Sequence, residues 1–103
     1  ISLPEGSTTD EVVDEILKLN EDPNVQGLAL DLPEGVFSSK VLNAVKPEKD
    51  VDGLSDVNLG CLIHGDVFGC LVSPTACAVM EVLENLGETM CDNCNISEIF
   101  FTW

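Results

Sequence analysis

The sequence has no arginine, no tyrosine and a single histidine, and it contains only four lysines against 19 aspartates and glutamates. The net charge of −15 repels phosphate backbones and anionic lipids, so we expect neither nucleic acid nor a membrane surface as a partner. Long hydrophobic runs are also missing, since no apolar stretch approaches the roughly 20 residues that span a bilayer. The chain is nevertheless 45% hydrophobic, which predicts one folded domain rather than a disordered acidic tail.

The common nucleotide-binding and hydrolase motifs are absent as well. The sequence contains no G-x-G-x-x-G, no P-loop and no G-x-S-x-G, so nucleotide binding and elbow-type hydrolysis have no motif support. His64 could act with a serine or a cysteine, but nothing in the sequence marks that partner. A histidine in a surface loop is the simpler interpretation.

The cysteine content allows two interpretations. Five cysteines cannot all pair within one chain. Cys77 lies in an apolar helical pattern, where a cysteine is usually a small buried residue, so we expect a reducing compartment. Alternatively, Cys61, His64, Cys91 and Cys94 are residue types that bind zinc, which would suit a small acidic interaction module with a metal site. Cysteines that bind no metal are the default expectation.

Two longer helices are predicted where a capping signal precedes apolar residues at helical spacing. Thr8-x-x-Glu11 has the form of a capping box and predicts a helix from Thr9 to Asn20. Ser73-Pro74 is a typical helix start and predicts a helix from Pro74 to Leu86. The expected core positions of these helices are Val12, Val13, Ile16, Leu17, Leu19, Val79, Met80, Val82, Leu83 and Leu86.

The stretch VQGLALDL, Val25 to Leu32, predicts the central strand of a small, mostly parallel sheet. Its Leu28-Ala29-Leu30 core lacks polar alternation, as in a strand buried on both faces. Asp31 would then lie at the end of the strand where open α/β sheets bind ligands, although an acid at a frayed strand end explains it equally well. With shorter helices over Ser38–Val45 and Ser55–Ile63, the predicted fold class is α/β, a sheet flanked by helices.

Three segments together carry a family resemblance. VQGLALDLP, LNAVKPEKDVDGLSDVNLG and VSPTACAV occur in this order, and KPEKDVDG is followed by N-x-G at Asn58 to Gly60. They resemble the substrate domain of the methylenetetrahydrofolate dehydrogenase/cyclohydrolase family from Ile1 to Gly87. The resemblance implies an incomplete version of that family's α/β catalytic domain at residues 1–87 and a divergent tail at residues 88–103. It also implies tetrahydrofolate derivatives as ligands, a mitochondrial location with the cytoplasm as the alternative, and the family's homodimer as the assembly to test.

The resemblance further implies a folate site. The family's aspartate in K-D-V-D-G, here Asp52, holds the pterin ring, because a carboxylate offers two parallel acceptors to the ring N–H and the exocyclic amine. Pro74 belongs to the segment that closes the pocket, where Ser-Pro stands for the family's usual Thr-Pro. Lys49 and Asp50 are then expected to be solvated turn residues. Four residues match the family's V-Q-L-P strand end, which lines the same pocket: Leu30, Asp31, Leu32 and Pro33.

Departures from the family pattern limit the expected activity. Asp31 replaces the family's glutamine, so it lacks an amide donor when ionised and adds a negative charge beside Asp52. The catalytic Tyr-x-x-x-Lys motif is absent because the chain has no tyrosine, and the NADP-binding domain does not follow Gly87. We therefore expect a folate-site remnant with weak binding, no cofactor in this chain and no turnover. Whether the parent protein is a dehydrogenase/cyclohydrolase or only a formyltetrahydrofolate synthetase stays open.

Overall fold

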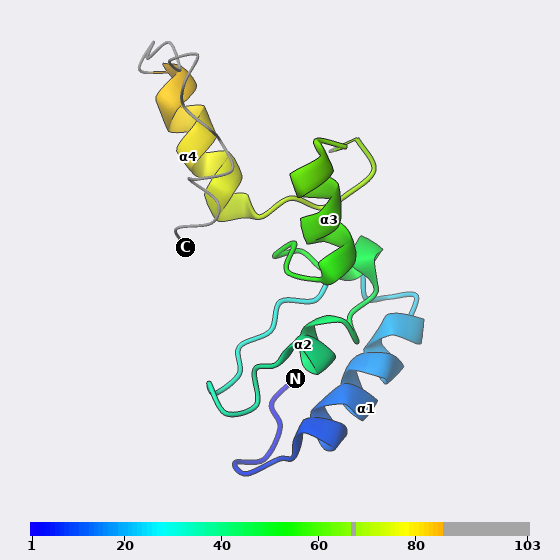
Figure 1. Cartoon of the computed structure of the whole chain (residues 1–103). Coiled ribbons are helices and arrows are strands. Elements are labelled where there is room, and N and C mark those ends of the chain that lie inside the picture. The colour runs from blue at the N-terminus through cyan, green and yellow to red at the C-terminus, as the bar shows by residue number, and fades with distance from the viewer. Residues whose placement is uncertain (67, 86–103) are drawn as a thin grey trace.

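The computed structural model of the chain describes residues 1–66 and 68–85. In chain order the elements are α1 (Thr9–Glu21), α2 (Ser39–Leu42), the 3-10 helix η1 (Pro47–Lys49), α3 (Asp56–His64) and α4 (Pro74–Asn85). Figure 1 shows α1 and α2 side by side with the N-terminal segment, whereas α3 and α4 lie toward the other end. Within the described residues, every helix is too short or too polar to cross a bilayer.

Helix α1 forms as predicted and supplies half of the small core. The Thr8 hydroxyl accepts from the Glu11 N–H and the Glu11 carboxylate accepts from the Thr8 N–H, which completes the capping box. Val12 and Ile16 are buried against Val41 and Val45, the core residues that follow α1. Leu17 was expected in this core but is 49% exposed, because it lies on the outer side of α1. Helix α2 is shorter than the predicted Ser38–Val45.

The predicted strand from Val25 to Leu32 is not formed in the described residues. One isolated parallel bridge pairs Leu28 with Asp50, and the Leu28 N–H donates to the Lys49 carbonyl at 2.7 Å. The expectation of burial on both faces is also wrong, because Ala29 and Asp31 are exposed while Leu28, Leu30 and Leu32 are half-buried. A strand needs neighbours along its whole length, and beside this segment the described chain supplies a partner at one bridge.

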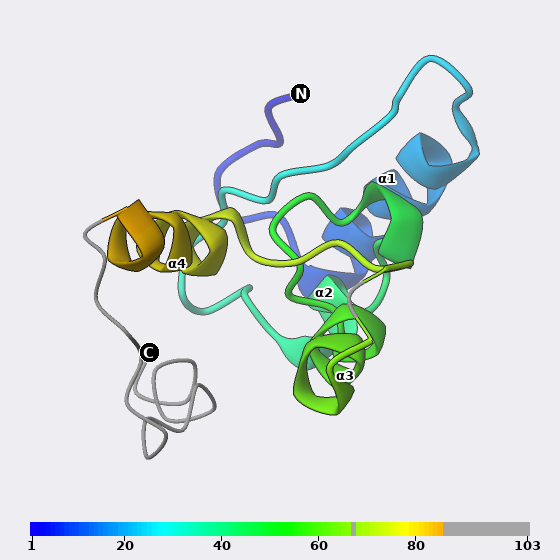
Figure 2. The ribbon, with the colours of Figure 1, turned by 90° about the horizontal axis from the view of Figure 1, so that it is seen from above.

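Helices α3 and α4 begin where their capping residues predict, but α4 is less buried than expected. The Ser55 hydroxyl accepts from the Asn58 N–H at the start of α3, and Gly65 ends α3 in the left-handed conformation. None of the described residues of α4 is buried, and Val79 and Val82 are 39% and 58% exposed. Figure 2 shows α4 set off to the side of the other helices. Within the described residues, the prediction that α4 contributes core residues is therefore wrong, and Leu86 lies outside them.

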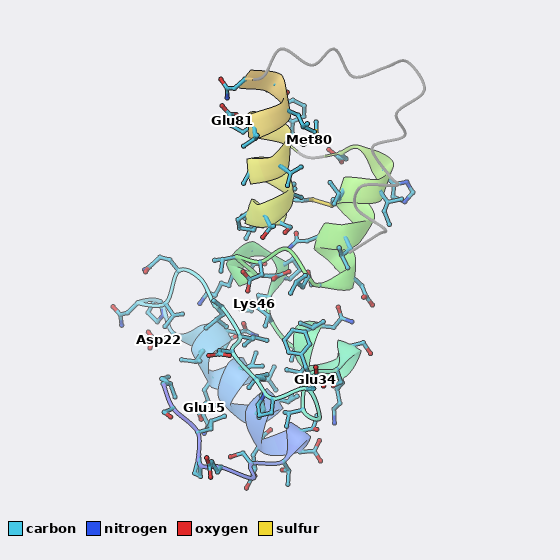
Figure 3. All side chains as sticks on the ribbon, turned by 90° about the vertical axis from the view of Figure 1, so that its left-hand side faces the viewer. Glu15, Asp22, Glu34, Lys46, Met80 and Glu81 are labelled. Carbon is cyan, nitrogen blue, oxygen red and sulfur yellow. A yellow bond between two sulfur atoms is a disulfide. The ribbon has the colours of Figure 1, made fainter. Side chains whose placement is uncertain are left out.

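Two of the cysteines pair, contrary to the expectation of reduced thiols. Cys61 on α3 forms a disulfide with Cys70, with the two Cα atoms 6.4 Å apart. Figure 3 draws this bond between α3 and the segment that leads into α4. In the same view, Met80 and Glu81 of α4 project in different directions. Cys77 is exposed rather than buried, because none of the described residues of α4 is packed into the core.

Candidate functional site

The turn from Pro47 to Gly53 is anchored to α1 by Lys49. The Lys49 ammonium donates to the carbonyls of Leu19, Asn20 and Asp22 at 3.2, 2.7 and 3.0 Å. These carbonyls lie at the C-terminal end of α1, where helical carbonyls lack partners and the helix dipole favours a cation. Lys49 is therefore a capping residue of α1, and the prediction of a solvated turn lysine is wrong.

Asp50 points into the protein rather than into solvent. It is 5% exposed, and its Oδ2 accepts from the Ser55 N–H at 2.8 Å and from the Asn58 amide at 2.9 Å. Burial alone would raise the pKa of Asp50, but hydrogen bonds from the backbone and hydroxyl of Ser55, the Asn58 amide and the Leu54 N–H hold that pKa below its usual value. The prediction that Asp50 is solvated is wrong. Its carboxylate lies at the start of α3 and accepts from the N–H of Ser55, the residue that caps this helix.

Gly53, the residue after Asp52, packs closely against residues 71–73, the segment that precedes Pro74. Gly53 has φ +65°, and a Cβ atom there would lie 2.7 Å from the Leu71 carbonyl oxygen and 2.9 Å from the Ser73 nitrogen. Only glycine allows the turn and the 71–73 segment to approach so closely. Asp52 is half-buried and immediately precedes this contact, and Pro74 immediately follows it as the first residue of α4.

The residues of the expected strand end line two other hollows. Leu30, Asp31 and Leu32 border a groove of about 320 Å³ beside α1, and Asp31, Leu32 and Pro33 border one of about 590 Å³ beside the N-terminal segment. Neither Asp52 nor Pro74 lines these grooves. The parallel bridge between Leu28 and Asp50 places the segment that leads to Leu30 beside the segment that leads to Asp52.

The zinc alternative gains no support from the described residues, where no three potential metal ligands cluster. The sulfur of Cys61 is bonded to Cys70, and a disulfide sulfur is not the thiolate that zinc binds. Cys91 and Cys94 lie outside the described residues, so this part of the prediction stays a prediction.

Sequence reasoning missed Asn58 as a side chain that organises the site. Its amide donates to the Pro47 carbonyl and to Asp50, both at 2.9 Å, and its oxygen accepts from the Leu71 N–H at 3.3 Å. The signal that could have identified it is N-x-G after KDVDG, which served only as a family marker.

Known proteins share this arrangement of segments. The profile of the family "Tetrahydrofolate dehydrogenase/cyclohydrolase, catalytic domain" matches residues 1–52. The chain is 59% identical to the mitochondrial monofunctional C1-tetrahydrofolate synthase of Bos taurus and 60% identical to that of Homo sapiens, over 87% and 84% of the chain. It spans 9% of the length of each of these relatives.

Solved structures agree with the sequence matches. A 5,10-methylenetetrahydrofolate dehydrogenase of the silkworm Bombyx mori superposes with a TM-score of 0.73 at 33% identity, covering 85% of this chain and 31% of the silkworm chain. The bifunctional FolD dehydrogenase/cyclohydrolase of Campylobacter jejuni superposes with a TM-score of 0.72 at 31% identity, covering 82% of this chain and 30% of the bacterial chain. These relatives support the α/β class, although the described residues form no sheet. The chain belongs to the tetrahydrofolate dehydrogenase/cyclohydrolase family.

Proposed function

We propose that residues 1–87 are part of a folate-binding substrate domain and that the chain binds a tetrahydrofolate derivative through Asp52. The observation that supports this proposal is the close packing of Gly53, the residue after Asp52, on residues 71–73, which directly precede α4. The relatives are named for tetrahydrofolate chemistry, and the closely similar bovine and human proteins are named as mitochondrial. We extend the mitochondrial location to this chain.

The two carboxylates of the KDVDG turn have different surroundings, which supports Asp52 as the ligand-binding one. Asp50 is buried and already accepts hydrogen bonds from Leu54, Ser55 and Asn58, so it has little capacity left for a ligand. Asp52 is only half-buried. A carboxylate in that position can accept in parallel from the ring N–H and the exocyclic amine of a pterin, and such charge-assisted pairs give both geometry and affinity.

Electrostatics should keep the affinity modest. The net charge of −15 opposes binding of an anionic ligand, and the four lysines include Lys49, which is already bonded to α1. Asp31 adds a further negative charge where the family has an amide. Folate with one glutamate should therefore bind at least as well as the polyglutamate forms, which carry more negative charge.

Binding is tested by titrating tetrahydrofolate into the wild-type chain and into Asp52→Ala, followed by fluorescence or calorimetry. Loss of a charged hydrogen-bonding pair costs about 1.5–3 kcal/mol, which corresponds to a roughly ten- to hundredfold weaker affinity. Asp14→Ala is the matched control, because it removes the same charge from an exposed position on α1. Asp31→Gln should bind slightly more tightly than wild type, because it lowers the negative charge of the chain that opposes an anionic ligand. Equal affinities of wild type and Asp52→Ala would contradict the proposal.

We further propose that the 103-residue chain has no turnover. It contains no tyrosine and therefore no Tyr-x-x-x-Lys motif. It also contains no phosphate-loop motif that could bind NADP. NADP reduction with methylenetetrahydrofolate should not exceed that of a heat-inactivated sample at high protein concentration. Sedimentation of the same sample tests for the homodimer, and reduction above the control would restore the full family activity as a hypothesis.

A further inference from the structure

Asn58 joins three segments that are distant in the sequence. From α3 its side chain contacts the Pro47 carbonyl before the turn, Asp50 within the turn and the Leu71 N–H before α4. The residue is 2% exposed, and both of its donor hydrogens and its acceptor oxygen are used. Because the side chain is buried, these bonds are shielded from solvent and link the three segments to one another.

The contact of Gly53 with residues 71–73 depends on this arrangement. The Gly53 N–H donates to the Asp50 carbonyl at 3.1 Å, which closes the turn around Asp52. The 71–73 backbone lies against Gly53 from the other side, and the Asn58 oxygen holds its first N–H. One helical turn beyond Asn58, the disulfide of Cys61 with Cys70 joins the same two segments a second time.

We propose that Asp50 and Asn58 are positioning residues that hold the Asp52–Gly53 turn against residues 71–73. The inference rests on the proposed function only for its ligand, because the positioning itself is a property of the chain. Asp50 accepts from the Asn58 amide and from the N–H of Ser55, which caps α3. The Asn58 oxygen in turn accepts from the Leu71 N–H and so links the turn to residues 71–73. Both side chains are buried, so in this proposal the ligand contacts Asp52, and Asp50 and Asn58 act by holding the turn that carries it.

A matched control lies at the same end of α3. Asn43 and Asp56 also form a reciprocal pair, in which the Asn43 amide donates to Asp56 at 2.9 Å and the Asp56 N–H donates back at 2.8 Å. Both residues are exposed, and the bonds that they form do not reach residues 71–73. Asn43→Ala therefore removes a comparable asparagine from the start of α3 without touching the Gly53 contact.

The test is amide hydrogen exchange by NMR on the full chain, combined with tetrahydrofolate titration. In Asn58→Ala the Leu71 and Gly53 amides should exchange at least about tenfold faster while the Ile16 amide in α1 keeps its rate, because the opening is local. Asn43→Ala should leave the Leu71 and Gly53 rates unchanged. Asp50→Asn should stay close to wild type and Asp50→Ala should resemble Asn58→Ala, since asparagine keeps one acceptor oxygen at position 50. Affinity for tetrahydrofolate should fall about tenfold in Asn58→Ala.

Each result bears on one of the two proposals. Wild type without folate affinity contradicts the proposed function, while the exchange rates still decide the positioning role. Unchanged Leu71 exchange in Asn58→Ala, or an equal increase in Asn43→Ala, overturns the positioning role. Faster exchange with undiminished folate affinity shows that Asp52 needs no such support, which also overturns it. If Asn58→Ala does not fold, Asn58→Ser, which keeps one donor, is judged by the same two rates.

Discussion

Replacing Lys49 with methionine should destabilise the chain far more than the same change at any surface lysine. Methionine keeps most of the aliphatic stem, so the change removes mainly the ammonium group and its three bonds to the last carbonyls of α1. Hydrogen bonds to charged groups contribute about 1.5–3 kcal/mol in favourable cases, and a cation at a helix C-terminus adds about 0.3–1 kcal/mol. Because Lys49 is half-buried and water reaches part of the site, we expect a total loss of about 2 kcal/mol.

Urea denaturation followed by circular dichroism measures this loss. With an m-value of about 1.5 kcal/mol/M, the midpoint of Lys49→Met should fall by about 1.3 M at pH 7. Lys18→Met is the matched control, because it makes the same change in charge but removes only an exposed ion pair with Glu15. Its midpoint should stay within experimental error of wild type. Equal midpoints for the two variants would refute the argument that Lys49 caps α1.

Three further predictions concern the core, the buried carboxylate and the disulfide. Val41→Ala should cost about 2 kcal/mol, because Val41 is fully buried, whereas Val57→Ala, at a position that is 57% exposed, should leave the urea midpoint near wild type. The hydrogen bonds to Asp50 lower its pKa, so the stability that its charge contributes is present above the usual aspartate pKa of 3.8 and is lost as the pH falls through the lower folded-state pKa. Wild type should therefore exceed Asp50→Asn in urea midpoint at pH 7, and this difference should shrink on acidification; a difference that does not change with pH would contradict the argument. Reduction of Cys61–Cys70, nine residues apart, should lower stability by about 2–3 kcal/mol from chain entropy, and an unchanged melting temperature with a dithiol reductant would contradict this.

The sequence alone determined the features of this protein that depend on neighbouring residues. Thr8 and Glu11 complete their capping box within one turn, Ser55 caps α3, and Gly65 ends it. These interactions span three or four residues, so their partners can be identified from spacing without knowledge of the fold. The family resemblance was likewise carried by ordered motifs in the chain and is confirmed by the relatives.

Tertiary structure decided everything that depends on distant partners. Lys49 bonds to carbonyls 27 to 30 positions earlier, and Asn58 accepts from Leu71, 13 positions later. Composition could not distinguish Asp50 from Asp52, because both lie in the same acidic turn and only the position of α3 makes one of them buried. The predicted strand and the apolar surface of α4 fail for the same reason, since a hydrophobic pattern states what a segment can bury but not whether a partner is present to cover it.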